Sequence, residues 1–107
     1  MTMTLGPMNF LAGREVMGFQ SEGWTLAAEP PHEADRSHRV AVTFLTPFGG
    51  VPLVHLGIAG FDVCNGDAAR LTATATEVTS HGFTILLSTW LNTRIWRVDV
   101  NWLAIGA

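Results

Sequence analysis

The segment IWRVDVNWLAI, residues 95–105, constrains the fold more than any other part of the chain. Its apolar and polar side chains alternate with a period of two, and successive side chains of an extended strand point to opposite faces. The apolar face carries Trp96, Val98, Val100 and Trp102. The polar face carries Arg97, Asp99 and Asn101. We therefore expect a strand with one face against a core and the other in water.

The same alternation recurs upstream, whereas no helical period persists beyond roughly one turn. The predicted strands are HRVAVTF (38–44), PLVHLGIAG (52–60), RLTATATEV (70–78) and GFTILLSTW (82–90), with a first strand around NFLAG (9–13) or EVMGF (15–19). Proline and glycine make the segment TPFGGVP (46–52) a loop. About six short strands separated by turn signals are typical of an all-β sandwich or barrel.

The strand at residues 82–90 is apolar on both sides. Phe83, Ile85 and Leu87 share one face, and Leu86 and Trp90 share the other. A monomeric antiparallel sandwich would leave one of these faces exposed. Charged residues are only 14% of the chain, against an average of about 25%. Both observations favour an oligomer.

Length and charge limit the classes of function. With 107 residues, the chain suits one domain, in which we expect residues 38–107 to form the core sandwich and 1–37 to add an N-terminal strand and loops. The net charge is −3 and the six lysine and arginine residues form no run. Nucleic acid is therefore excluded as the expected partner, because phosphate binding needs a basic surface.

Cys64 is the only cysteine, so an intrachain disulfide and a zinc site built from several thiolates are both excluded. No apolar stretch reaches the roughly 20 residues of a membrane span, and the N-terminus lacks the basic start and apolar run of a signal peptide. We therefore expect no membrane insertion and synthesis as a soluble cytoplasmic protein, with any delivery to a surface following a non-classical route.

Two stretches carry a further pattern: VTFLTPFGGVPLVHLGIAGFDV (42–63) and GFTILLSTWLNTRIWRVDVNWLAIG (82–106). In order they contain a TF…PF…P…V start, a DV strand ending, a GF strand start, a TW.NT turn and a closing V.W.AI, with an arginine opening the strand between them. Over roughly residues 40–105 this order resembles the H-type lectin domain, the family of snail agglutinins and of the C-terminal domain of slime-mould discoidins. The N-terminal third is similar only through the Gly23-Trp24 pair.

This resemblance implies a six-stranded antiparallel β-sandwich that assembles as a homotrimer. It also implies binding of glycans that end in galactose or N-acetylgalactosamine, without calcium or any other cofactor. In such lectins the sugar sites lie near one end of the trimer, close to the boundary between subunits.

A neutral sugar is recognised by a carboxylate, by guanidinium or amide donors, and by an aromatic face against its C–H groups. On the family's pattern the guanidinium falls on Arg70 and the two aromatics fall on Trp90 and Trp96. Each has a structural alternative. Arg70 also suits a solvated strand end, and Trp90 suits an interface or the core. Trp96 shares its predicted face with Val98, which favours core packing.

The carboxylate has two candidates, because the family's acid precedes the TF strand at a spacing that this chain does not keep. Glu33 fits the ungapped spacing and Asp35 fits by side-chain length. Asn92 and Arg94 are expected at the rim, where Asn92 also suits the turn itself. Leu91 stands where the family often has a histidine, which removes a polar contact to the acetamido group.

The sequence therefore predicts a trimeric lectin, and the alternative is a structural or protein-interaction trimer, such as a fibre tip, whose sugar site has decayed. An enzyme is not expected. No two histidines have the strand or helix spacing that would bring two metal ligands together, and Cys64 has no cationic neighbour in sequence to favour its thiolate.

Overall fold

The structure, a computed structural model, describes residues 7–30 and 34–107, and within these ranges the regular structure is all β. The strands are β1 (Asn9–Gly18), β2 (Arg36–Thr43), β3 (Leu53–Val63), β4 (Thr72–Thr76), β5 (Gly82–Thr89) and β6 (Ile95–Gly106). All the predicted strands are present. Both candidate segments for the first strand contribute to the single strand β1.

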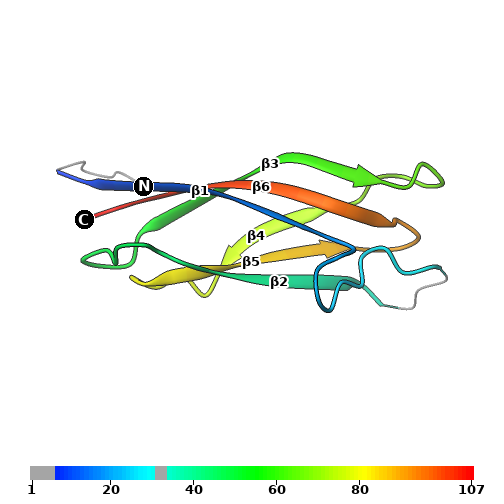
Figure 1. Cartoon of the computed structure of the whole chain (residues 1–107), viewed down its shortest axis with the longest axis horizontal. Coiled ribbons are helices and arrows are strands. Elements are labelled where there is room, and N and C mark those ends of the chain that lie inside the picture. Colours follow the sequence, from blue (N-terminus) through cyan, green and yellow to red (C-terminus); the bar gives the residue numbers. More distant parts are fainter. Residues whose placement is uncertain (1–6, 31–33) are drawn as a thin grey trace.

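The strands form two antiparallel three-stranded sheets that face each other as a sandwich (Figure 1). One sheet has the order β1-β6-β3 and the other has the order β2-β5-β4. Among the described strands, β4 and β5 are consecutive neighbours in one sheet, and every other connection crosses between the sheets. The turn at residues 90–94 is therefore a crossing from β5 to β6 and not a hairpin.

The crossings place three loops at one end of the sandwich. The connections β1–β2, β3–β4 and β5–β6 meet there, at the right of Figure 1, while the start of β1, the C-terminus and the remaining connections lie at the other end. Loops held by a rigid scaffold are the usual place for binding residues. The predicted site residues that the structure describes belong to these three loops or to the strand residues next to them.

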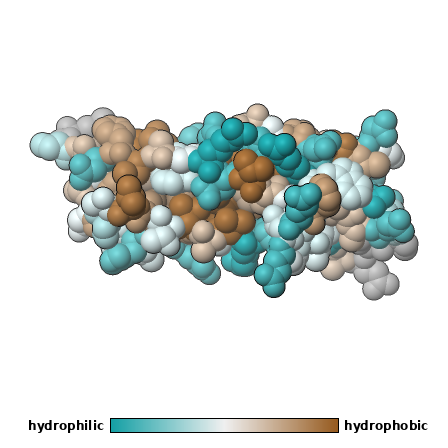
Figure 2. All heavy atoms as spheres, viewed as in Figure 1, coloured by the Kyte–Doolittle hydropathy of each residue, from teal (hydrophilic) through white to brown (hydrophobic). Residues whose placement is uncertain are grey.

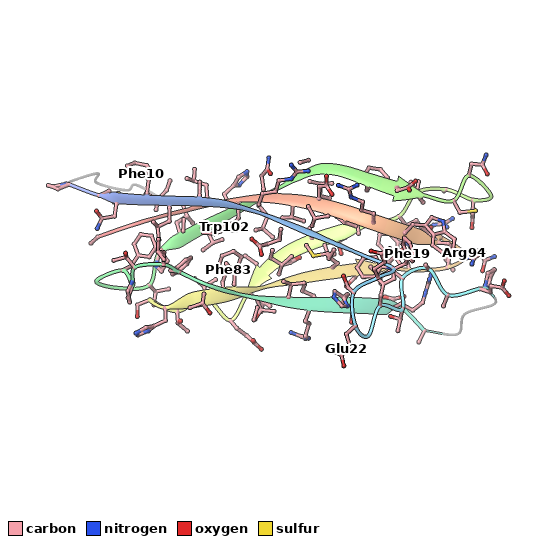
Figure 3. The ribbon with its side chains drawn as sticks, in the orientation of Figure 1. Phe10, Phe19, Glu22, Phe83, Arg94 and Trp102 are labelled. Atoms are coloured by element: carbon pink, nitrogen blue, oxygen red, sulfur yellow. The ribbon has the colours of Figure 1, made fainter. Side chains whose placement is uncertain are left out.

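The core is built on the two central strands. Phe83, Ile85 and Leu87 of β5 and Val98 and Val100 of β6 are buried, as the alternation predicted. Burying each such side chain contributes roughly 1.5–3 kcal/mol. Figure 3 shows Phe83 and Trp102 between the sheets, where their rings meet edge to face with centroids 5.4 Å apart.

The outer faces of the two sheets differ. On the β2-β5-β4 sheet Leu86 is half-buried between Arg39 and Thr74, its cross-strand neighbours. The larger apolar surface lies on the other sheet, where Phe10, Ile105 and Leu53 form one cross-strand row. Phe10 is 64% exposed and Leu53 is 58% exposed, and Figure 2 shows apolar surface gathered toward this end.

The core interpretation of Trp96 was wrong. Asp62 of β3 pairs with Arg97, but Val63 pairs with Ile95, so the register shifts and Trp96 has no partner on β3. A bulge of this kind inserts one residue and re-aims the side chains next to it. Ile95 is fully buried and takes the inward position, while Trp96 stays partly exposed.

Candidate functional site

The β5–β6 turn is tied to the β3–β4 loop by two threonines. Thr89, the last residue of β5, donates its hydroxyl to the carbonyl of Arg70 at 2.6 Å. Thr93 donates its hydroxyl to the carbonyl of Ala68 at 2.6 Å. Both threonines are almost fully buried, so their hydroxyls need these bonds. The two loops therefore form one unit.

Leu91, at the tip of this turn, has a left-handed backbone with a φ of 55°. A leucine rarely adopts this conformation, because its Cβ comes close to the following carbonyl oxygen. The side chain is 58% exposed. The turn therefore keeps a strained backbone conformation, which implies that contacts with the surrounding structure hold it in place.

Arg36 provides that fixing. It opens β2 and is only 9% exposed. Its Nη2 donates to the carbonyls of Leu91 at 2.8 Å and Thr93 at 2.9 Å, and its Nη1 donates to the carbonyl of Leu26 at 3.2 Å. Burial lowers the pKa of Arg36, and the charge of Asp35 opposes that effect. One buried guanidinium thus joins two of the three crossings, through two carbonyls of the β5–β6 turn and one of the β1–β2 loop.

Arg70 forms an ion pair with Asp67 in the β3–β4 loop. Its Nη1 lies 3.0 Å from Asp67 Oδ2 and 3.0 Å from the Thr93 hydroxyl. The hydrogen bond from Arg70 lowers the pKa of Asp67, and the bond from the backbone N–H of Ala68 to Oδ1 adds to this. The side chains remain 21% and 34% exposed. The Asp67 carboxylate and the Arg70 guanidinium are therefore held side by side and remain accessible to solvent.

An open hollow of about 470 Å³ lies among these loops. Its lining residues are Pro30, Cys64, Gly66, Asp67, Asn92 and Arg94. Arg94 donates Nε–H to the carbonyl of Ala27 at 2.9 Å, and its guanidinium carbon lies 4.9 Å from the ring centre of Trp96. The hollow offers an acid, an amide and a guanidinium, and these groups can bind vicinal hydroxyls.

The predicted site residues separate into two groups. Asn92 and Arg94 line this hollow, and Arg70 is linked to it through Asp67. Asp35 is exposed, and Trp90, half-buried after the end of β5, does not line the hollow.

The last two predicted site residues, Trp96 and Glu33, do not line the loop hollow or cannot be placed in it. Trp96 contacts Arg94 but lines another hollow. Glu33 lies outside the described residues, so its candidacy stays a prediction.

Sequence reasoning missed Asp67 and Arg36. Asp67 had a signal, because it precedes Arg70 by three residues in a glycine-containing loop. Arg36 had no such signal, because an arginine beside Asp35 in a polar loop is expected to be exposed to solvent. Within residues 7–30 and 34–107 no group of three His, Cys, Asp or Glu side chains is placed to hold a metal ion. That part of the chain also contains no helix able to cross a membrane.

Comparison with known proteins agrees with this architecture. A sequence model of the H-type lectin domain matches residues 39–105. A protein of Fuscovulum blasticum described as ATP synthase subunits region ORF 7 is 40% identical over 72 residues, which are 67% of this chain and 63% of that protein. The chain thus spans less than two thirds of this relative.

Two solved structures share the fold. Discoidin II of Dictyostelium discoideum superposes with a TM-score of 0.78 at 20% identity, covering 98% of this chain and 39% of that one. The tailspike protein of Pseudomonas phage LKA1 superposes with a TM-score of 0.60 at 19% identity, covering 92% of this chain and 15% of that one.

Proposed function

Because the chain belongs to the H-type lectin domain family, a non-catalytic lectin family, we propose that it binds terminal galactose-type sugars without calcium at the hollow between its three loops. The observation that carries this proposal is the meeting of Asp67, Asn92 and Arg94 around one opening, with Arg70 holding the acid. These side chains come from two crossings that the threonine bonds and Arg36 hold rigid. Prearranged groups bind a ligand at a lower entropic cost.

The hollow explains how a sugar is bound without a metal. Asp67 is ionised at neutral pH, since its pKa is lowered, and it accepts hydrogen bonds from hydroxyls. Arg94 and Asn92, which line the same hollow, supply donors. The preference for galactose-type sugars comes from the family resemblance. Leu91 offers no polar contact to an acetamido group, so we expect galactose and N-acetylgalactosamine to bind with similar affinity.

We propose further that the chain assembles as a homotrimer. The support is the amount of apolar surface at the end away from the loops, where Phe10, Leu45, Val51 and Leu53 are each more than half exposed. Surface of this kind marks protein contacts. Three weak sites held together raise the effective affinity for a glycan-coated surface by about 10²–10⁴ when the geometry permits.

A glycan array on the purified protein, with its mass measured by light scattering on the same sample, tests both parts. Binding confined to galactose-type termini from a trimer is the expected result. Arg70→Ala should lower array binding at least tenfold without changing the mass. Arg39→Ala is the matched control, because Arg39 is 58% exposed on the outer face of β2, and it should leave binding unchanged.

The same apolar surface favours the second candidate, a protein-interaction module. Its signature would be a trimer that binds no glycan on the array. In that case Arg70→Ala would have no binding to remove, and the partner should be sought through the Phe10 surface.

A further inference from the structure

A second hollow, of about 440 Å³, opens where β1 ends and β6 begins. Its lining residues are Val16, Met17, Gly18, Phe19, Gln20, Ser21, Trp96 and Arg97. Phe19 is 61% exposed, although nothing in the core or in the loop hollow requires an aromatic ring at this position. Figure 3 shows Phe19 near the same end of the sandwich as Arg94.

The bulge in β6 creates this second hollow. It turns Trp96 away from the core, and the backbone N–H of Phe19 donates to the carbonyl of Trp96 at 2.8 Å. The two rings stand at 83° with centroids 6.2 Å apart, which forms an aromatic corner. Gly18 permits the approach, because a Cβ there would lie 2.4 Å from the carbonyl oxygen of Trp96.

Arg94 connects the two hollows through its contact with Trp96. It lines the loop hollow, and its guanidinium carbon lies 4.9 Å from the ring centre of Trp96, which lines the second hollow. The hydrogen bond from Arg94 Nε–H to the carbonyl of Ala27 fixes the position of the Arg94 side chain. A ligand bound in the loop hollow and reaching past Arg94 would therefore meet Trp96 of the second hollow.

The chemistry of the second hollow suits a pyranose ring. Aromatic faces pack against the C–H groups of a sugar, and Gln20, Ser21 and Arg97 provide polar groups around the rings. Ser21 Oγ accepts a hydrogen bond from the Gly18 N–H at 3.0 Å and can still donate its own proton. Arg97 uses Nε and Nη2 on Asp99, so Nη1 can face a hydroxyl.

We propose that this aromatic corner is a second sugar subsite, which binds an inner residue of a glycan whose terminal galactose-type sugar occupies the loop hollow. The inference rests on the proposed function, because it assigns the neighbouring part of the same ligand. It makes the protein a reader of oligosaccharides rather than of single terminal sugars.

Calorimetric titration with methyl β-galactoside, lactose and lacto-N-neotetraose tests this proposal. The wild-type chain should bind the tetrasaccharide about five- to tenfold more tightly than methyl β-galactoside, the range expected for one aromatic contact. Phe19→Ala should remove this gain and leave the affinity for methyl β-galactoside unchanged. Arg39→Ala is the control, since Arg39 is 58% exposed on the outer face of β2 and lines neither hollow, and it should keep the gain.

Each contrary outcome has its own pattern. A wild-type affinity that does not increase with glycan length overturns the second subsite and leaves the lectin function intact. A change of mass in Phe19→Ala by light scattering would show that the corner is a subunit contact, which also overturns it. Absence of binding by every sugar, the monosaccharide included, would overturn the proposed function and the subsite together.

Discussion

Replacing Arg36 with methionine should destabilise the fold through the β5–β6 turn. The methionine keeps most of the apolar stem but removes the donors to the carbonyls of Leu26, Leu91 and Thr93. The Leu26 carbonyl keeps a second donor, the backbone N–H of Ile95 at 2.8 Å. Two carbonyls therefore lose the partner that the structure gives them.

The magnitude follows from those two groups. An unsatisfied buried carbonyl costs about 1–3 kcal/mol. The Thr93 carbonyl is in a buried bond and the Leu91 carbonyl is in a part-buried one, so the gross loss is roughly 2–5 kcal/mol. Removing the guanidinium also removes the cost of burying its charge, which the lowered pKa of Arg36 reveals. We expect a net loss of about 3 kcal/mol, which lowers the Tm by on the order of 15 °C for a domain of this size.

Urea unfolding followed by tryptophan fluorescence measures this loss. The midpoint should fall by about 2 M with an unchanged slope, at a fixed protein concentration because an oligomer's stability depends on it. Arg39→Met is the control on the same strand. Arg39 is 58% exposed and lies 3.9 Å from Glu77, so its loss should change stability by less than about 0.5 kcal/mol. An equally small loss for Arg36→Met would refute the bracing role.

Three other changes have defined outcomes. Gly82→Ala should cost about 3 kcal/mol in urea unfolding, because a Cβ there would lie 2.2 Å from the Val42 carbonyl oxygen, whereas Gly57→Ala, with open space around it, should be nearly neutral. Leu91→Asn should raise stability by about 0.5–1 kcal/mol, since asparagine tolerates the left-handed backbone better; an unchanged Tm would contradict the strain. The hydrogen bond from Arg14 lowers the pKa of Asp99. The ionised Asp99 therefore stabilises the fold above its unfolded-state pKa of about 4, and this stabilisation is lost as the pH falls through its folded-state pKa. Asp99→Asn should make the free energy of unfolding depend less on pH over that acidic window, and an unaltered pH dependence would exclude this linkage.

The faces of the strands were predictable from sequence because a strand repeats every two residues. Val98 and Val100 are buried and Arg97 is exposed, as the alternation of β6 required. The same pattern failed at Trp96, because one bulged residue shifts the phase of the alternation. A bulge depends on the partner strand β3, and the sequence of β6 alone does not contain it.

The candidate site was predicted in part for a similar reason. The motif around the β5–β6 turn located Asn92 and Arg94, which do line the loop hollow. It did not locate Asp67, because the ion pair with Arg70 depends on how the β3–β4 loop packs under Thr93.

The sequence by itself determined the all-β class, the inward residues of the central strands and the family, because periodicity and ordered motifs are local properties of a chain. The tertiary structure decided which loops meet, that Arg36 is buried and joins two of them, and that Trp96 contacts Phe19 on the surface. These features arise from contacts between residues far apart in sequence, such as Arg36 with Thr93. Such contacts follow only from the way the two sheets exchange strands.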